Sequence, residues 1–338
     1  MHLLRDFIDA LGLAGPATYL LIFLAASLLM VWRLEALMDH GLEGTALGTL
    51  VIPYCSGFGN LVFVFILLRD DRASSELVVN ALVNNVTNLT VLLGLPALLW
   101  GLAVVPAPSS AGRRPAKARQ KEQTERQLSR LTLLLTLAAA GFFAGAVWLL
   151  GRDGRLDRTD GMALIGLFLF WQAFQVFDVL KHNVRQRIAF GPGFYFDLVL
   201  LVAGAAVLYE SLDWLVGWLA SGQGGRWLRP DLLGWLSGWL LVLPNAVLAL
   251  YYGWRRRADV AYSSQVGDGH ICIPLCLGLF ALWRPVTMPA LFSEGMAFLG
   301  GALAVHVLFL IVPGRLPRWV GGGLIAAYAA FVYAGLGG

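Results

Sequence analysis

The sequence predicts an all-α integral membrane protein with ten transmembrane helices arranged as two inverted five-helix repeats. Hydrophobic residues make up 58% of the 338 residues and charged residues only 14%, with a mean hydropathy of +0.70. Apolar runs of about 20 residues, the length that crosses a bilayer, recur from end to end. A pattern of polar residues inside the apolar stretch 80–98 also recurs, in weaker form, at 264–282. These observations indicate a duplicated membrane protein.

Residues 1–181 form the first predicted five-helix repeat, with its core element at 45–98. Its spans are expected at about 16–37, 45–68, 75–95, 131–150 and 161–180. Pro53, Gly57 and Gly59 interrupt the second span, and a broken helix at membrane depth is tolerated only where its freed backbone lines a cavity. The turn R-D-D-R leads into the third span, which Pro96 should kink. The basic stretch 113–130 should be a solvated loop that passes into the charged start of the fourth helix.

Residues 182–338 form the second predicted repeat, with its core element at 232–282. Its spans are expected at about 195–220, 232–253, 260–283, 289–312 and 319–334. The sixth span ends in Glu210 and Asp213 much as the first ends in Glu35 and Asp39. The connector W-R-R-R-A-D after the seventh span mirrors R-D-D-R-A-S after the second. Five spans per half, an odd number, force the halves into opposite orientations in the bilayer, which is the architecture of secondary transporters.

The basic residues predict the orientation of the chain. Connectors after the odd-numbered spans hold sixteen of the 25 Lys and Arg residues, and the more basic side of a membrane protein is cytoplasmic. We therefore expect an integral protein of a bacterial inner (plasma) membrane, with both termini on the outer side and the lipid bilayer as its surroundings. The sequence leaves the oligomeric state open.

Several function classes are excluded by composition and motifs. The net charge of +4 is spread over short connectors, so no nucleic-acid partner is implied. No Walker motif, G-x-S-x-G, H-E-x-x-H or dinucleotide fingerprint is present, so we expect neither an ATP-driven pump nor an enzyme, and no cofactor. Cys55, Cys272 and Cys276 all fall in apolar segments and form no C-x-x-C pair.

The repeated polar pattern marks the centre of the molecule. With Gly94 set on Gly278, a helical stripe of Asn80, Asn84 and Asn88 aligns with Ser264, Asp268 and Cys272. Polar side chains inside a membrane need a partner, a cavity or a function. Asp268 is the strongest candidate, because an unpaired intramembrane acid is costly. His270 would point to another face of the same helix and is expected to be a packing or gating residue.

Four short elements occupy matching places in the two halves of the chain. They read C-S-G-F-G-N at 55–60, V-N-N-V-T-N at 83–88, L-L-V-L-P-N at 240–245 and G-D-G-H-I-C at 267–272. These elements resemble those of the cation/Ca²⁺ antiporter superfamily, to which sodium/calcium exchangers belong and in which each half carries G-T-S-x-P-E on a broken helix and then G-S-N-I-x-N or G-S-N-I-x-D. The resemblance implies a sodium/calcium exchanger-like fold, with a midplane ion site exposed to each side in turn as spans one and six slide past the other helices.

The resemblance also implies which residues form the transport site. The two central glutamates of the family fall on Asn60 and Asn245, and the second half lacks the hydroxyl ligands that Ser56 retains in the first. The implied ion-binding set is Ser56, Asn60, Asn84, Asn88, Asn245, Asp268 and Cys272. These residues offer amide oxygens and one carboxylate, whereas Ca²⁺ usually takes six to eight oxygens with several carboxylates. Tight Ca²⁺ exchange is therefore not expected.

A single carboxylate suits a monovalent cation such as Na⁺, or a proton carried on Asp268 or His270. Two alternatives stay open. The chain could be a membrane scaffold or sensor that keeps the exchanger fold without transport, since asparagines often only bond neighbouring helices. A soft metal could also bind to Cys55, Cys272 and Asp268, because thiolates favour zinc or copper(I).

Overall fold

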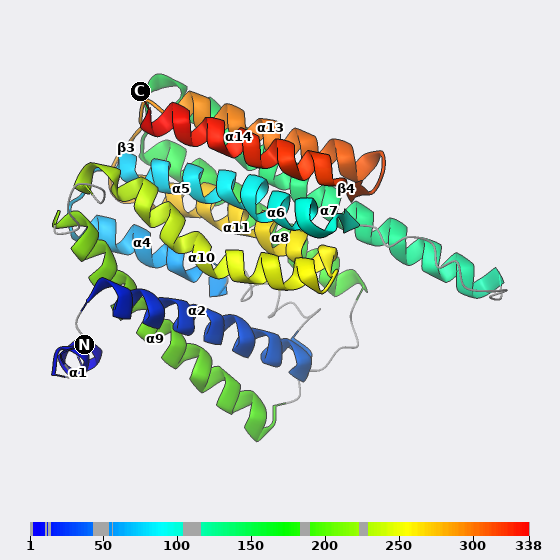
Figure 1. The fold of residues 1–338 in the computed structure, drawn as a ribbon, viewed down its shortest axis with the longest axis horizontal. Helices are drawn as coiled ribbons and strands as arrows, with labels where there is room; N and C mark the ends of the chain where they lie inside the picture. Colours follow the sequence, from blue (N-terminus) through cyan, green and yellow to red (C-terminus); the bar gives the residue numbers. More distant parts are fainter. Residues whose placement is uncertain are drawn as a thin grey trace.

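The protein is almost entirely helical (Figure 1). The computed structural model describes residues 3–10, 12, 15–42, 54–55, 57–103, 116–182, 190–222 and 229–337. Within these ranges nine helical segments are long and apolar enough to cross a membrane, and a shorter apolar helix, Phe58–Arg69, occupies the place of the second expected span. The all-α membrane class is confirmed.

The first half contains the elements α1 to α8. They are α1 (Leu3–Ala10), α2 (Pro16–Leu37) with the π-turn η1 (Met38–Leu42), α4 (Phe58–Arg69), α5 (Ser75–Thr87), η2 (Asn88–Leu92), α6 (Leu93–Trp100), β1 (Leu102–Ala103), α7 (Ala116–Leu150), η3 (Gly151–Asp153), β2 (Arg155–Leu156) and α8 (Arg158–His182). α2 begins at Pro16 because proline fits the first turn of a helix, where its missing N–H is not needed. The expected break at Pro53 lies outside the described residues.

The second half contains the elements α9 to α14. They are α9 (Pro192–Ala220), η5 (Pro230–Leu232), α10 (Leu233–Trp254), α11 (Ala258–Ile271), η6 (Cys272–Cys276), α12 (Leu277–Trp283), β3 (Val286–Thr287), α13 (Phe292–Ile311), β4 (Arg315–Leu316) and α14 (Arg318–Leu336). α10 is continuous over 22 residues, even though Pro244 lies inside it.

The third and eighth spans each contain a π-helical segment at the same place, η2 between α5 and α6 and η6 between α11 and α12. A π-turn widens the helix by one residue, which makes room near a proline ring that would clash with the carbonyl four residues before it. Pro96 follows η2 and Pro274 lies within η6. The third span therefore continues to Trp100 instead of ending near residue 95.

Two close helix crossings each join a helix of one half to a helix of the other, and exchanging the two halves turns one crossing into the other. A Cβ on Gly94 of α6 would lie 3.0 Å from the carbonyl oxygen of Gly321 on α14, and a Cβ on Gly278 of α12 would lie 3.2 Å from that of Gly161 on α8. Glycine at these crossings allows the two backbones to approach closely. The two antiparallel ladders follow the same exchange, β1 with β4 and β2 with β3. Two inverted repeats, 1–181 and 182–338, would produce such paired contacts.

Helices α2 and α9 form a pair along one flank of the bundle (Figure 1). They are antiparallel, because Arg33 near the end of α2 binds Asp197 near the start of α9 at 2.8 Å. His40 Nε2 lies 3.2 Å from the same carboxylate, and Tyr19 stacks on Trp214 with ring centroids 4.0 Å apart. Ion pairs and stacking thus join α2 and α9 into one unit beside the other helices.

Candidate functional site

Asp268 of α11 lies at the centre of the bundle, with only 5% of its surface exposed. Three amide groups from three other elements donate hydrogen bonds to its carboxylate. Asn60 Nδ2 donates to Oδ1 at 3.3 Å, while Asn88 Nδ2 and Asn245 Nδ2 donate to Oδ2 at 3.0 and 3.2 Å. The elements α4, η2, α10 and α11, far apart in the sequence, therefore meet at one carboxylate.

The three asparagines of the first half close a ring with Asp268. Asn88 Nδ2 also donates to Asn84 Oδ1 at 2.9 Å, and Asn84 Nδ2 donates to Asn60 Oδ1 at 3.3 Å. The ring fixes the orientation of each amide, because every N–H₂ group in it faces an oxygen acceptor. One acceptor is left over: Asn88 Oδ1 is buried and has no hydrogen-bond partner among the described residues.

Helical spacing and glycines explain why these side chains meet. Asn84 and Asn88 are four residues apart, so both lie on one face of the third span. The start of α4 can approach α11 and α10 because Gly57 and Gly59 carry no side chain. A Cβ on Gly57 would lie 2.5 Å from Cγ2 of Ile271, and one on Gly59 would lie 3.0 Å from Leu241. The glycines that interrupt the second expected span thus bring Asn60 to the carboxylate.

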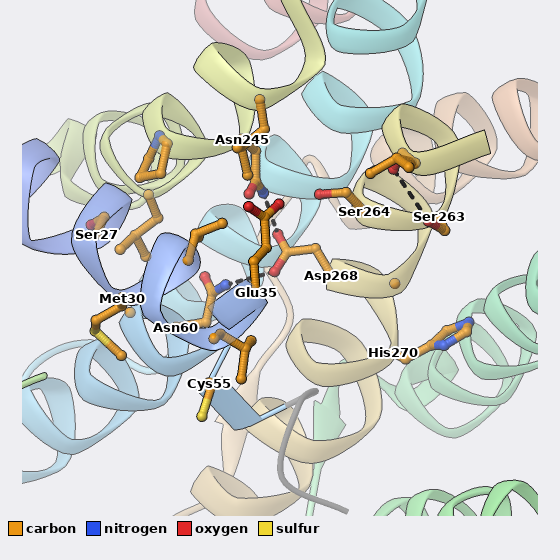
Figure 2. A pocket seen from close by; sticks show the side chains of 18 of the residues that line it. Ser27, Met30, Glu35, Cys55, Asn60, Asn245, Ser263, Ser264, Asp268 and His270 are labelled. Atoms are coloured by element: carbon orange, nitrogen blue, oxygen red, sulfur yellow. Dashed lines mark hydrogen bonds between the residues drawn. The ribbon is translucent and has the colours of Figure 1, made fainter. Parts of the chain in front are cut away.

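A cavity of about 530 Å³ opens beside this network (Figure 2). Asn60, Asn245 and Asp268 line its inner part, with Ser264 one turn before Asp268. Most of the remaining wall comes from the second halves of α2, α8 and α10 and the first half of α11, with Thr136 of α7 and Leu208 of α9. The cavity therefore runs from Asp268 toward the end of the bundle where α10 turns into α11, and leaves Asn84 and Asn88 behind the carboxylate.

Glu35 is a second carboxylate in the cavity wall, and sequence reasoning missed it as a site residue. It projects from α2 and accepts a hydrogen bond from the hydroxyl of Tyr252 on α10. No Lys or Arg occurs among the described residues that line this cavity. The signal was present in the sequence, because an acid within an expected span marks a functional candidate, but its place near the end of the span made it look like a boundary residue.

The structure separates the remaining candidates. Cys272 is 1% exposed and lies one turn beyond Asp268, while Ser56 lies outside the described residues. His270 points away from the carboxylate, as expected (Figure 2). Its Nε2 lies 3.0 Å from the carbonyl oxygen of Thr136, and the ring packs edge-on against Phe143 and Trp171. The described residues contain no group of three His, Cys, Asp or Glu side chains that could hold a metal ion, so the soft-metal alternative has no geometric support there.

The free-energy cost of burying the Asp268 carboxylate is nearly offset by the hydrogen bonds that it accepts. Moving a carboxylate out of water costs several kcal/mol in a protein after relaxation. A hydrogen bond to a charged group returns about 1.5–3 kcal/mol, and three amides donate to this carboxylate. Asp268 can thus stay ionised without a basic partner. Its oxygens are then available to a small cation that enters from the cavity.

Comparison with known proteins gives a family and a fold. Residues 11–177 match the family described as sodium/calcium exchanger protein. The structure resembles the sodium-calcium exchanger NCX_Mj soaked with 2.5 mM Na⁺ and 1 mM Sr²⁺, with a TM-score of 0.65 and 18% identity over 94% of this chain and 97% of that one. NCX_Mj soaked with 2.5 mM Na⁺ and 10 mM Sr²⁺ gives a TM-score of 0.64 and 19% identity over 95% and 98%. No curated protein sequence matches at a significant level.

Proposed function

Because residues 11–177 match the sodium/calcium exchanger family and the fold resembles that of a sodium-calcium exchanger, we propose that the chain is a member of the cation/Ca²⁺ antiporter superfamily and a secondary active transporter that moves a small inorganic cation by alternating access. Members of this family are transporters, not enzymes, and they use no cofactor, since the transported cation is the substrate. The observation that carries the proposal is Asp268, a buried carboxylate at the inner end of a cavity with no Lys or Arg in its described lining.

The ligands around Asp268 favour a monovalent cation or a proton over Ca²⁺. Asn60 and Asn245 turn amide nitrogens toward the carboxylate, so an arriving ion meets donors where additional carboxylates would be needed for tight Ca²⁺ binding. One negative charge balances one monovalent cation in a cavity of low dielectric constant. Na⁺ and H⁺ are the substrates that this charge fits.

Alternating access requires one group of helices to move against another. The ion-paired helices α2 and α9 donate none of these hydrogen bonds to Asp268 of α11, whereas α4, η2 and α10 each donate one. We infer that α2 and α9 move as a unit past this fixed centre. The recurrence of helix crossings in both halves supports the division into repeats 1–181 and 182–338.

A membrane scaffold or sensor without transport is the second candidate. The closed ring of Asn60, Asn84 and Asn88 favours it, because these amides satisfy the carboxylate in the absence of an ion. A satisfied polar ring can serve only to fix the packing of helices. The two candidates differ in whether an ion crosses the membrane.

Flux of Na⁺ and H⁺ in proteoliposomes tests the proposal. Wild-type protein should exchange them, and Asp268→Asn should abolish coupled flux or its pH dependence, because the amide cannot carry a charge or a proton. Asp231→Asn, at an exposed carboxylate paired with Arg229, is the matched control and should leave flux unchanged. Full activity in a folded Asp268→Asn protein would favour the scaffold.

A further inference from the structure

Glu35 and Asp268 face the same cavity, but they lie on parts of the protein that we infer to move relative to each other. Asp268 belongs to the fixed centre, whereas Glu35 belongs to α2. The bond from the Tyr252 hydroxyl to Glu35 crosses from α10 to α2. Tyr252 lies seven residues beyond Asn245 on α10, so the Glu35–Tyr252 pair sits about 10 Å from the centre, toward the open end of the cavity.

The cavity carries two negative charges and holds room for water. A hydroxyl group is a neutral partner, so this hydrogen bond does not neutralise the charge of Glu35. The facing helix α8 contributes Gln172, which is 4% exposed and whose Nε2 has no partner among the described residues. Buried unpaired amides are normally satisfied by water, and a cavity of about 530 Å³ exceeds the roughly 30 Å³ of one water molecule many times over. A hydrated ion can therefore reach both carboxylates.

Building on the proposed function, we propose that Glu35 is a second cation-binding residue, which takes a monovalent cation at the mouth of the cavity before the ion reaches Asp268. Tyr252 holds the empty carboxylate of Glu35 and releases it when the cation arrives. At an effective dielectric constant of about 20, the repulsion between two monovalent cations about 10 Å apart lowers the second affinity roughly 15-fold, and each cation is neutralised by its own carboxylate. Both positions can therefore be occupied at once.

Calorimetric titration of the purified full-length protein with NaCl and with KCl, at ionic strength held constant by an organic cation, tests this proposal. Wild type should bind two ions. In Glu35→Gln, the binding event at the cavity mouth should be about tenfold weaker or absent. In Asp268→Asn, the binding event at the centre should be lost. Tyr252→Phe should strengthen the Glu35 event severalfold, because the carboxylate no longer gives up a hydrogen bond, and damage to the fold would not produce that gain.

Glu210→Gln is the control. Glu210 lies on α9, in the sequence position that matches Glu35 in the other repeat, and it does not line the cavity. Glu35→Gln protein that titrates like wild type would overturn the role of Glu35, while loss of binding in Asp268→Asn would still support the central site. If Asp268→Asn leaves binding intact and Glu35→Gln abolishes it, cation binding at Asp268 is disproved and cation binding at Glu35 is supported.

Discussion

Asn60 and Asn245 hold the two positions on which selectivity for Ca²⁺ would depend. Both amides are committed to Asp268 as donors, at 3.3 and 3.2 Å. Calorimetry on the purified protein should therefore show no micromolar Ca²⁺ binding. The double variant Asn60→Glu with Asn245→Glu should raise Ca²⁺ affinity at least tenfold, since it adds two carboxylates to the one present. Tight Ca²⁺ binding by wild type would show that the ligands have been misplaced.

The sequence predicted most of the residues that surround Asp268, but it did not predict the second carboxylate in the cavity or the hydrogen-bond partners of each amide. Aligning Gly94 with Gly278 brought Asn84 and Asp268 together in advance, because helical spacing fixes which residues share a face. Glu35 was not identified, since its distance from Asp268 depends on how α2 packs against α10. That Asn88 Oδ1 has no partner among the residues that the structure describes was also unforeseen, because hydrogen-bond partners depend on the rotation of side-chain amides.

At the scale of elements, the apolar runs predicted helix positions well and helix irregularities poorly. α2 spans the expected residues, but the π-turns η2 and η6 carry no period that a sequence displays. The carbonyl oxygen of Leu89 in η2 accepts a hydrogen bond from Nε2 of the buried His306 on α13, at 2.6 Å. Such a turn is stabilised by a residue more than 200 positions away, which hydropathy cannot reveal.

The glycine crossings give a direct test of helix packing. In Gly321→Ala, the new Cβ would lie 2.5 Å from the carbonyl oxygen of Gly94, so α14 must shift away from α6. Overpacking of this kind costs about 1–3 kcal/mol, and the thermal unfolding temperature in detergent should fall. Gly323→Ala on the same helix meets nothing within 4 Å and should be neutral. Equal stability of the two variants would contradict the close crossing.

For the whole molecule, the open prediction is the orientation in the membrane. The end of the bundle with Glu35 and Tyr252 also carries Arg33 and the connector 255–257, and this excess of basic residues predicts that it faces the cytoplasm. Alkaline phosphatase fused to the C-terminus should then be active, since that reporter needs an exported environment. A fusion within the connector 255–257 should be inactive, and the reverse pattern would invert the topology.

Different interactions hold the two ends of the α2–α9 pair to the neighbouring helices. At the end far from the cavity mouth, Arg69 of α4 binds Asp213 at 2.7 Å and Tyr209 at 3.3 Å, both on α9. This ion pair is partly exposed, so it contributes about 0–1 kcal/mol and weakens as salt is added. In the proposed transport cycle, one reorientation step breaks this ion pair and the opposite step breaks the hydrogen bond from Tyr252 to Glu35, so the two steps should differ in rate. Zero-trans flux should therefore differ by up to about fivefold between the two directions, and Arg69→Gln, or high salt on that side alone, should change this ratio.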